Sequence, residues 1–258
     1  IVMGILNLTS DSFYDGGKYL TEENIIKKCV KIKKLGAKII DIGACSSRPG
    51  SNPVSQQEEL KRLIPAIKLV RKYTKNLFIS VDTFRSEVAI ACVENGADMI
   101  NDISAGENDK NMFDTIIKLN VPYIMMHMKG NPLTMQNKPN YNDVMSELKE
   151  FFNTKIENLN NKGFNKIIID PGFGFGKTLD NNYTILKNLM QFKEFNLPIL
   201  IGASRKSMIY NILNKKPETS LNGTSIINTI GLINGASILR VHDVEEAMEC
   251  IKITNTLK

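Results

Sequence analysis

The chain has 258 residues, of which 42% are hydrophobic and 23% charged, a balance typical of a folded protein with a substantial core. No apolar run approaches the roughly 18 residues that span a bilayer, which argues against a membrane protein. The net charge of +6 comes from lysines spread over several expected helices without interleaved aromatic residues, so we expect no nucleic-acid partner. A cationic surface of this kind favours anionic small molecules instead.

Eight short apolar runs, rich in β-branched residues and without strict alternation, indicate strands buried on both faces of a parallel sheet. They occupy residues 1–7, 38–41, 77–82, 98–102, 122–127, 166–170, 198–204 and 236–242. Segments with helical periodicity lie between them. This order predicts an α/β fold, a (β/α)8 TIM barrel, as a single domain over residues 1–258. Because the chain begins inside the first run, we expect the native N-terminus to lie upstream.

Several of the expected helices have readable ends. Thr21 can cap a helix whose apolar positions recur every three or four residues, and Gly36 ends it. Helices are also predicted over residues 56–73 and 87–95. The seventh unit stays open, because residues 204–213 and 223–234 could form two helices around a connector rich in Lys, Pro and Asn.

The four cysteines include no Cys-x-x-Cys pair, and Cys29, Cys92 and Cys250 fall at core-like positions of expected helices. Reduced, buried thiols are therefore the favoured interpretation. No charged-then-apolar leader precedes the first strand. These features together predict a cytoplasmic protein.

A polar residue recurs at the end of the apolar runs, just before a stretch rich in Gly, Ser or Pro. These residues are Asn7, Asp41, Asp82, Asn101, His127, Asp170, Ser204 and the pair Arg240 and His242. Catalytic residues of a (β/α)8 barrel come from the carboxyl ends of the strands and the loops after them. The pattern therefore predicts functional groups arranged around one mouth of the barrel.

Three of these residues have the chemistry to bind a ring. Asp82, Asn101 and Asp170 supply two carboxylates and an amide. A buried carboxylate accepts hydrogen bonds from an amino group and the adjacent ring N–H together, so the set suits a flat nitrogen heterocycle. An Asp before a loop can instead cap a helix or a turn, and that alternative stays open for Asp41. His127 likewise stays open as a core histidine.

A second group suits an anion. Arg48, Arg240, His242 and Asn7 lie on or after the first, second and eighth strands, which adjoin when the barrel closes. Guanidinium groups recognise phosphate, and the amide oxygen of Asn7 could help to complete the oxygen shell of Mg²⁺. One site is therefore expected to hold both a heterocycle and a phosphorylated arm.

Residues 172–178 read GFGFGKT and are superficially similar to a nucleotide-binding loop. The phosphate-loop motif needs four residues between its first Gly and the Gly-Lys pair, whereas only three separate Gly172 from Gly176. The segment also follows the sixth strand of a barrel series. We therefore predict no nucleotide phosphate site here.

Eight segments, in order along the chain, resemble the signature segments of dihydropteroate synthases. They are MGILNLTSDSFYDGG at 3–17, DIGACSSRPG at 41–50, SVDTFR at 80–85, NDISAG at 101–106, MHMKGNPLTMQ at 126–136, DPGFGFGKT at 170–178, GASRKSMI at 202–209 and RVHD at 240–243. The resemblance implies a transferase of folate biosynthesis that joins 6-hydroxymethyl-7,8-dihydropterin diphosphate to 4-aminobenzoate and releases diphosphate. It also implies Mg²⁺ as cofactor, a cytoplasmic homodimer and a target of sulfonamides.

The same resemblance assigns roles to individual residues. The catalytic residues would be Asp82, Asp170, Lys206 and Arg240. The pterin would be held by Asp82, Asn101, Met126, Asp170 and Lys206. The diphosphate would be held by Asn7, Arg48, Arg240 and His242, with Asn7 also meeting Mg²⁺. The aminobenzoate would be framed by Phe13, Ser47, Arg48, Pro49, Phe175, Lys206 and Ser207, and Asp11 and Asp15 would help to close the first loop.

Four positions depart from the family pattern: Ser10, Ala44, Cys45 and Ser47. Ser10 stands where Pro is usual, so we expect a more flexible first loop. Ser47 keeps the hydroxyl of the usual Thr. Cys45 is expected to be a somewhat exposed thiol.

The chemistry implied by the resemblance agrees with the residues. A neutral aromatic amine is a usable nucleophile, so no strong general base is needed. We expect a dissociative displacement in which Mg²⁺ and Arg240 draw off diphosphate while Asp82 and Asp170 stabilise the pterin cation. Two alternatives stay open: a pterin-binding methyl-transfer barrel with a corrinoid partner, and a barrel that binds without turnover.

Overall fold

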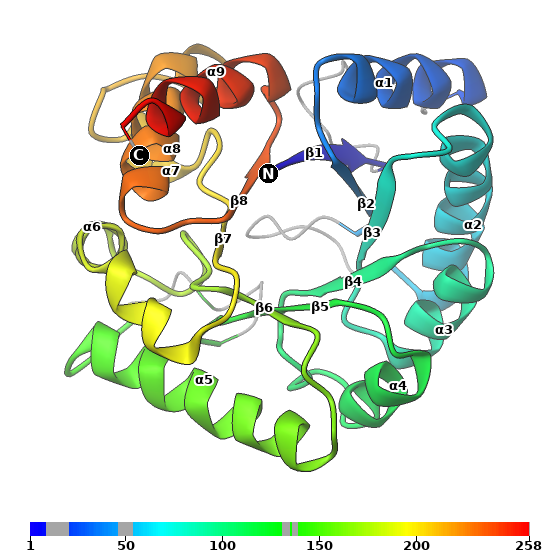
Figure 1. The fold of residues 1–258 in the computed structure, drawn as a ribbon, viewed down its shortest axis with the longest axis horizontal. Helices are drawn as coiled ribbons and strands as arrows, with labels where there is room; N and C mark the ends of the chain where they lie inside the picture. The colour runs from blue at the N-terminus through cyan, green and yellow to red at the C-terminus, as the bar shows by residue number, and fades with distance from the viewer. Residues whose placement is uncertain (9–20, 46–53, 131–134, 136–138, 258) are drawn as a thin grey trace.

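The computed structural model describes residues 1–8, 21–45, 54–130, 135 and 139–257. Eight parallel strands form one sheet in the order β6-β5-β4-β3-β2-β1-β8-β7. A parallel bridge between Ile169 and Ile199 joins β6 to β7. This bridge closes the sheet into a barrel, and the helices surround it (Figure 1). The predicted (β/α)8 TIM barrel is therefore confirmed.

Each strand overlaps its predicted run. The strands are β1 (Val2–Asn7), β2 (Ile39–Gly43), β3 (Phe78–Asp82), β4 (Met99–Asp102), β5 (Tyr123–Met126), β6 (Ile167–Asp170), β7 (Leu200–Ile201) and β8 (Ile238–Val241). The largest difference is at β7, which is much shorter than the predicted run. At its amino end, Pro198 accepts from the Ile169 N–H but has no N–H to donate, so regular pairing starts after it. At its carboxyl end, residues 202–204 of the predicted run lie outside the strand.

The helices also match their sequence signals. They are α1 (Glu22–Lys34), α2 (Gln56–Tyr73), α3 (Ser86–Glu94), α4 (Met112–Leu119), α5 (Val144–Asn161), α6 (Leu179–Lys187), α7 (Ser207–Tyr210), α8 (Leu221–Ile233) and α9 (Val244–Asn255), with 3-10 turns η1 (Leu189–Phe195) and η2 (Pro217–Thr219). The Thr21 side chain accepts from the Asn24 N–H at 3.3 Å, as predicted. Gly36 follows α1 with a φ of +101°, which favours glycine. The seventh unit contains two α-helices, α7 and α8.

Alternation along the strands separates two layers inside the barrel. One layer is apolar and consists of Met3, Ile39, Met99, Ile124, Ile168, Leu200 and Ile238. Because successive side chains of a strand point to opposite faces, residues two positions further along point the same way. Those positions include Asp41, Asn101, Met126, Asp170 and Arg240. The polar side chains therefore lie one step closer to the carboxyl ends of the strands than the apolar layer.

The cysteine prediction is also confirmed. Cys29, Cys92 and Cys250 are buried, Cys45 is half-buried, and all four thiols are free. Among the residues that the structure describes, the helices lack the combination of length and apolar character needed to cross a membrane.

Candidate active site

Parallel pairing aligns the ends of the first four strands. Asn7 lies opposite Gly43, Gly43 opposite Asp82, and Asp82 opposite Asn101. A Cβ built on Gly43 would lie 3.5 Å from the Cβ of Asp82 and 3.8 Å from Oδ1 of Asn7. The missing side chain at Gly43 therefore lets Asn7 and Asp82 approach a common space, although the sequence had assigned them to different parts of a ligand.

Arg240 on β8 is the centre of an ion-pair network. Its Nε donates to Oδ2 of Asp41 at 2.7 Å, and its Nη2 donates to Oδ2 of Asp82 at 2.9 Å. Oδ2 of Asp41 also accepts from Nδ2 of Asn101 at 3.1 Å. Asp41 is fully buried and binds these two side chains. Asp41 therefore orients Arg240 and Asn101. This geometry supports a role in the site for Asp41 rather than a role as a helix cap or turn residue.

Burial and charge act against each other in this network. Burial raises the pKa of Asp82 to about 7, and the opposing effect of Arg240 is the largest of the remaining influences. Burial alone would lower the pKa of Arg240, but Asp41 and Asp82 outweigh it, so the pKa of Arg240 is raised. Arg240 therefore stays cationic, and its charge favours the ionised form of the Asp82 carboxyl against the effect of burial.

Asp170 lies at the end of β6, opposite Met126 of β5. Its Oδ1 accepts from the Gly172 N–H at 2.8 Å, and its Oδ2 lies 4.0 Å from a Cβ built on Gly202, a position that also approaches the Arg240 side chain. Burial raises the pKa of Asp170, with Lys206 the strongest opposing influence. Asp170 therefore presents a carboxylate toward the same interior as Arg240.

Lys206 reaches across to the segment after β6. Its Nζ donates to the carbonyl of Phe173 at 2.6 Å and lies 4.5 Å from the centre of the Phe175 ring. Burial lowers the pKa of Lys206 to about 8, and Asp170 is the strongest opposing influence. Lys206 and Phe175, both assigned to the aminobenzoate, are therefore in contact. Ser207, assigned with them, is the first residue of α7.

An apolar wall adjoins the polar groups. Met126 belongs to a buried cluster with Ile103, Met128, Met135 and Phe175, and Phe84 packs against this cluster. Methionine and aromatic side chains adapt to the face of a flat ring. The mouth of the barrel thus combines carboxylates for the edge of a ring with an apolar surface for its face.

Both histidines of the chain lie near the barrel mouth, and burial lowers the pKa of each imidazole. His242 follows β8, and burial together with Arg240 lowers its pKa to about 4, so its imidazole is neutral at pH 7 and adds no positive charge. His127 is buried with its ring 4.8 Å from that of Phe151, and burial lowers its pKa to about 2. The structure therefore supports the core alternative for His127.

Two features of the site were missed by sequence reasoning. Arg205 has a left-handed φ of +57°, and its Nε and Nη2 each donate to the Asp243 carboxylate at 2.7 Å. This pair fixes the backbone next to Lys206 to the end of β8. Lys177 of the GFGFGKT segment points inward to backbone carbonyls, so it does not present its charge to a nucleotide phosphate. The rejection of a nucleotide loop agrees with this geometry.

Several predicted residues lie outside the part of the chain that the structure describes: Ser10, Asp11, Phe13, Asp15, Ser47, Arg48 and Pro49. Cys45 lies at the edge of one such segment. Its Sγ is 3.8 Å from Nη1 of Arg85, and burial raises the pKa of the thiol to about 12. The thiol is thus less reactive than an ordinary cysteine.

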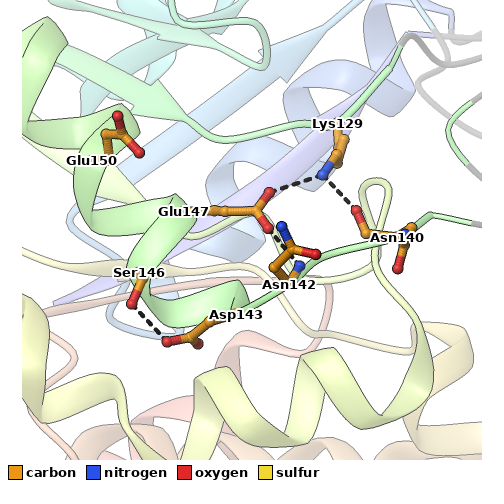
Figure 2. Close-up of a pocket in the computed structure, with 7 residues that line it drawn as sticks. All are labelled: Lys129, Asn140, Asn142, Asp143, Ser146, Glu147 and Glu150. Atoms are coloured by element: carbon orange, nitrogen blue, oxygen red, sulfur yellow. Dashed lines mark hydrogen bonds and ion pairs between the residues drawn. The ribbon is translucent and has the colours of Figure 1, made fainter.

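A surface pocket of about 400 Å³ lies at the start of α5 (Figure 2). It is lined by Lys129, Asn140, Asn142, Asp143, Ser146, Glu147 and Glu150. Nζ of Lys129 donates to the Asn140 carbonyl at 2.5 Å and to Oε2 of Glu147 at 2.9 Å. Lys129 thus forms an ion pair with Glu147 inside this pocket, and the pocket includes none of the residues that the sequence assigned to a ligand.

Comparison with known proteins agrees with this geometry. Residues 3–242 match the protein family described as "Pterin binding enzyme". The dihydropteroate synthase of Escherichia coli is 42% identical over 254 residues, which cover 98% of this chain and 89% of that protein. The dihydropteroate synthase of Synechocystis is 41% identical over 259 residues, which cover 99% of this chain and 89% of that protein.

Solved structures extend the similarity to three dimensions. The dihydropteroate synthase of Yersinia pestis, solved with a sulfonamide drug complex, has a TM-score of 0.95 at 39% identity and covers 99% of this chain and 93% of that one. The enzyme of Xanthomonas albilineans, solved with 4-aminobenzoic acid, has a TM-score of 0.91 at 37% identity and covers 99% of this chain and 92% of that one. With its polar groups at the carboxyl ends of a closed parallel barrel, this chain belongs to the pterin binding enzyme family and is similar over nearly its whole length to dihydropteroate synthases.

Proposed function

We propose that this protein is a dihydropteroate synthase, acting as a single catalytic domain in folate biosynthesis. It joins the methylene carbon of 6-hydroxymethyl-7,8-dihydropterin diphosphate to the amino nitrogen of 4-aminobenzoate and releases diphosphate. The observation that carries this proposal is the convergence of Asp82, Asn101 and Arg240 on one mouth of the barrel. That arrangement offers acceptors for the edge of a pterin beside a cation for the leaving group.

The ring end of the substrate would be held by Asp82, Asn101 and Asp170. A pterin edge carries an amino group and ring N–H groups, which match carboxylate and amide oxygens. Met126 would cover one face of the ring and Lys206 the other. Since Asp82 is within 2.9 Å of Arg240, the substrate would also change the partners of this guanidinium.

The diphosphate end would be held by Asn7, Arg48, Arg240 and His242. Arg240 supplies a permanent positive charge, whereas His242 is neutral at pH 7 and would contribute a hydrogen bond. The aminobenzoate would be framed by Phe13, Ser47, Arg48, Pro49, Phe175, Lys206 and Ser207. Asp11 and Asp15 would help to close the site over the substrates.

Asn7 has the chemistry expected of a weak Mg²⁺ ligand. In the described part of the chain, His, Cys, Asp and Glu side chains do not gather in groups of three or more that could hold a metal ion. Mg²⁺ commonly keeps several waters and takes its other ligands from one or two protein oxygens and from substrate phosphates. The Asn7 amide oxygen and the diphosphate fit that description. When bound, Mg²⁺ would neutralise charge on the diphosphate.

The reaction would proceed by dissociative displacement. The bond between the pterin methylene and the diphosphate oxygen breaks, and its electron pair leaves with diphosphate toward Arg240. Asp82 and Asp170 stabilise the resulting pterin cation because their carboxylates face the ring. The neutral amine of 4-aminobenzoate then forms the new C–N bond and loses a proton to water, so no strong general base is needed.

The sequence resemblance further suggests a cytoplasmic homodimer that sulfonamides inhibit. The relative from Yersinia pestis, which was solved with a sulfonamide drug complex, supports the last point. Light scattering on a sizing column gives the mass of the assembly. Inhibition by a sulfonamide that is competitive with 4-aminobenzoate would place the drug at the aminobenzoate position.

Diphosphate release measured with and without 4-aminobenzoate tests the activity. Release that depends on the amine, with dihydropteroate as the second product, supports the synthase. A methyl-transfer barrel would release no diphosphate, and a binding barrel would retain pterin affinity without turnover. Either result would overturn the proposed function.

A further inference from the structure

Two glycines of the GFGFGKT segment bring two backbones into direct contact. Gly172 has a φ of +70°, and a Cβ there would lie 2.0 Å from the carbonyl oxygen of His127. Gly176 has a φ of +62°, and a Cβ there would lie 2.2 Å from the carbonyl oxygen of Lys129. Since no side chain fits at either position, the segment after β6 packs backbone to backbone against residues 127–129, which follow β5.

Lys177 ties these segments together from the inside. Its side chain is buried, and its Nζ lies 3.2 Å from the His127 carbonyl, 2.9 Å from that of Gly172 and 3.0 Å from that of Phe175. Nδ1 of His127 is a fourth partner at 3.0 Å. An ammonium group has three donors and no acceptor, so it suits a cage of acceptors. We name this cage, made of Lys177, His127, Gly172 and Phe175, the lysine clasp.

The groups around the lysine clasp keep it intact. Burial lowers the pKa of His127 to about 2, so the ring stays neutral and its Nδ1 can accept a hydrogen bond from Lys177. The Tyr141 hydroxyl donates to the Gly176 carbonyl at 2.7 Å, and Nζ of Lys129 lies 4.1 Å from the centre of the Tyr141 ring. Tyr141 therefore contacts both segments.

The lysine clasp borders three groups proposed to contact the substrates. Oδ1 of Asp170 accepts from the N–H of Gly172, so the clasp fixes the acceptor geometry of this carboxylate. Met126 directly precedes His127 in the chain. The Phe175 carbonyl accepts from Lys177, while the Phe175 ring lies in the methionine cluster and contacts Lys206. Burial lowers the pKa of Lys177 to about 7, and Asp170 is the strongest opposing influence. The positive charge of Lys177 in turn opposes the effect of burial on the pKa of Asp170.

We propose that Lys177 is a positioning residue of the pterin site: its ammonium locks the segment carrying Asp170 and Phe175 onto the segment that follows Met126. Lys177 itself touches no substrate. The inference rests on the proposed function, because that function identifies the pterin as the ligand of this site. Pre-organisation of this kind reduces the ordering cost of binding and keeps reacting groups in register.

The test compares Lys177→Met with Lys129→Met. Methionine is close to lysine in length but donates no hydrogen bond, and Lys129 belongs to the same pair of segments while its ammonium points into the outer pocket of Figure 2. Titration calorimetry with 6-hydroxymethylpterin is expected to show affinity about tenfold or more weaker for Lys177→Met. Lys129→Met should stay within about twofold of the wild type, as expected for a surface ion pair. Lys177→Arg, which keeps the cation, should recover part of the loss.

Calorimetry distinguishes a loss of pterin affinity from a loss of folded protein. A lower fraction of folded protein reduces the apparent number of sites but leaves the affinity of each folded site unchanged. Equal affinity for Lys177→Met and Lys129→Met would overturn the inference. If Lys177→Met does not fold, hydrogen exchange of the wild type decides: the Gly172 amide is expected to be strongly protected without ligand, and rapid exchange there would also overturn it.

The inference and the proposed function fail in different ways. If the wild type releases no diphosphate but binds the pterin, the calorimetric comparison still tests the lysine clasp. If the wild type is active and Lys177→Met keeps both its pterin affinity and its KM for the pterin diphosphate, only the clasp is wrong.

Discussion

The two sides of the barrel mouth hold their charges in different ways. On the side of β2, β3 and β8, the Arg240 guanidinium is paired with the carboxylates of Asp41 and Asp82. On the side of β5 and β6, the Lys177 ammonium is paired with backbone carbonyls and a neutral imidazole. Side chains can rotate to new partners when a ligand arrives, whereas these carbonyls are part of the framework. The first side is therefore suited to exchange partners with substrate, and the second to keep the site in shape.

The largest expected effect is a loss of stability on the side of β5 and β6, where backbone carbonyls hold the Lys177 ammonium. Gly172→Ala combines a left-handed φ with a Cβ 2.0 Å from a carbonyl oxygen, and we expect it to lower the free energy of unfolding by about 3 kcal/mol. Gly163→Ala is the matched control, because its φ of +79° is similar but no atom lies within 4 Å of the added Cβ. That variant should lose about 1 kcal/mol. Urea denaturation measures both, and equal losses would show that the close contact is unimportant.

Asp170 lies where the two sides meet. Asp170→Asn keeps the shape of the side chain but loses the negative charge, so we expect kcat/KM to fall about 100-fold through loss of cation stabilisation. Asp180→Asn, at an exposed position of α6, is the control and should be neutral. Steady-state diphosphate release is the measurement. Turnover within a factor of two of the wild type would remove Asp170 from the mechanism.

Arg240→Lys tests the side of β2, β3 and β8, where side chains can exchange partners with substrate. Lysine keeps the charge but cannot bridge Asp41 and Asp82 with two separate nitrogens, so we expect kcat/KM to fall about tenfold. Arg71 provides a matched control, because its guanidinium bridges Asp98 and the carbonyls of Leu77 and Gly96, near the amino ends of β3 and β4. Arg71→Lys should lower stability without changing kcat/KM. The comparison fails if both variants lose activity equally.

The smallest expected effect is a difference between the pKa values of the two histidines, which NMR titration measures. His242 should titrate near pH 4 and His127 near pH 2, because burial favours their neutral forms. Unfolding frees both groups to titrate near 6.5, so their contribution to stability is present above about pH 6.5 and is lost as the pH falls toward these folded values.

Added diphosphate sharpens the histidine comparison. A nearby anion stabilises the imidazolium form, so we expect it to raise the pKa of His242. The pKa of His127, enclosed by the lysine clasp, should not change. Equal shifts of both resonances would contradict a diphosphate position next to β8.

Local signals in the sequence predicted most of the framework. Apolar runs marked the eight strands, and the Thr21 cap and Gly36 marked the ends of α1, because strand burial and helix capping depend on residues close together in the chain. The strand ends also predicted Asp82, Asn101, Asp170 and Arg240 as site residues. Their chemistry follows from residue type, and their shared edge follows from parallel order.

Only the tertiary structure decided which of these groups are partners. Arg240 meets Asp41 across 199 residues because β1 pairs with both β8 and β2, and the strand register then sets the depth of each side chain. Burial depends on every surrounding element, and it keeps the His242 imidazole neutral. The packing of the segments after β5 and β6 likewise decides that Lys177 points to backbone carbonyls. The sequence by itself therefore determined the fold and the kinds of group at its mouth, whereas long-range packing decided which charges face one another and which are held by the backbone.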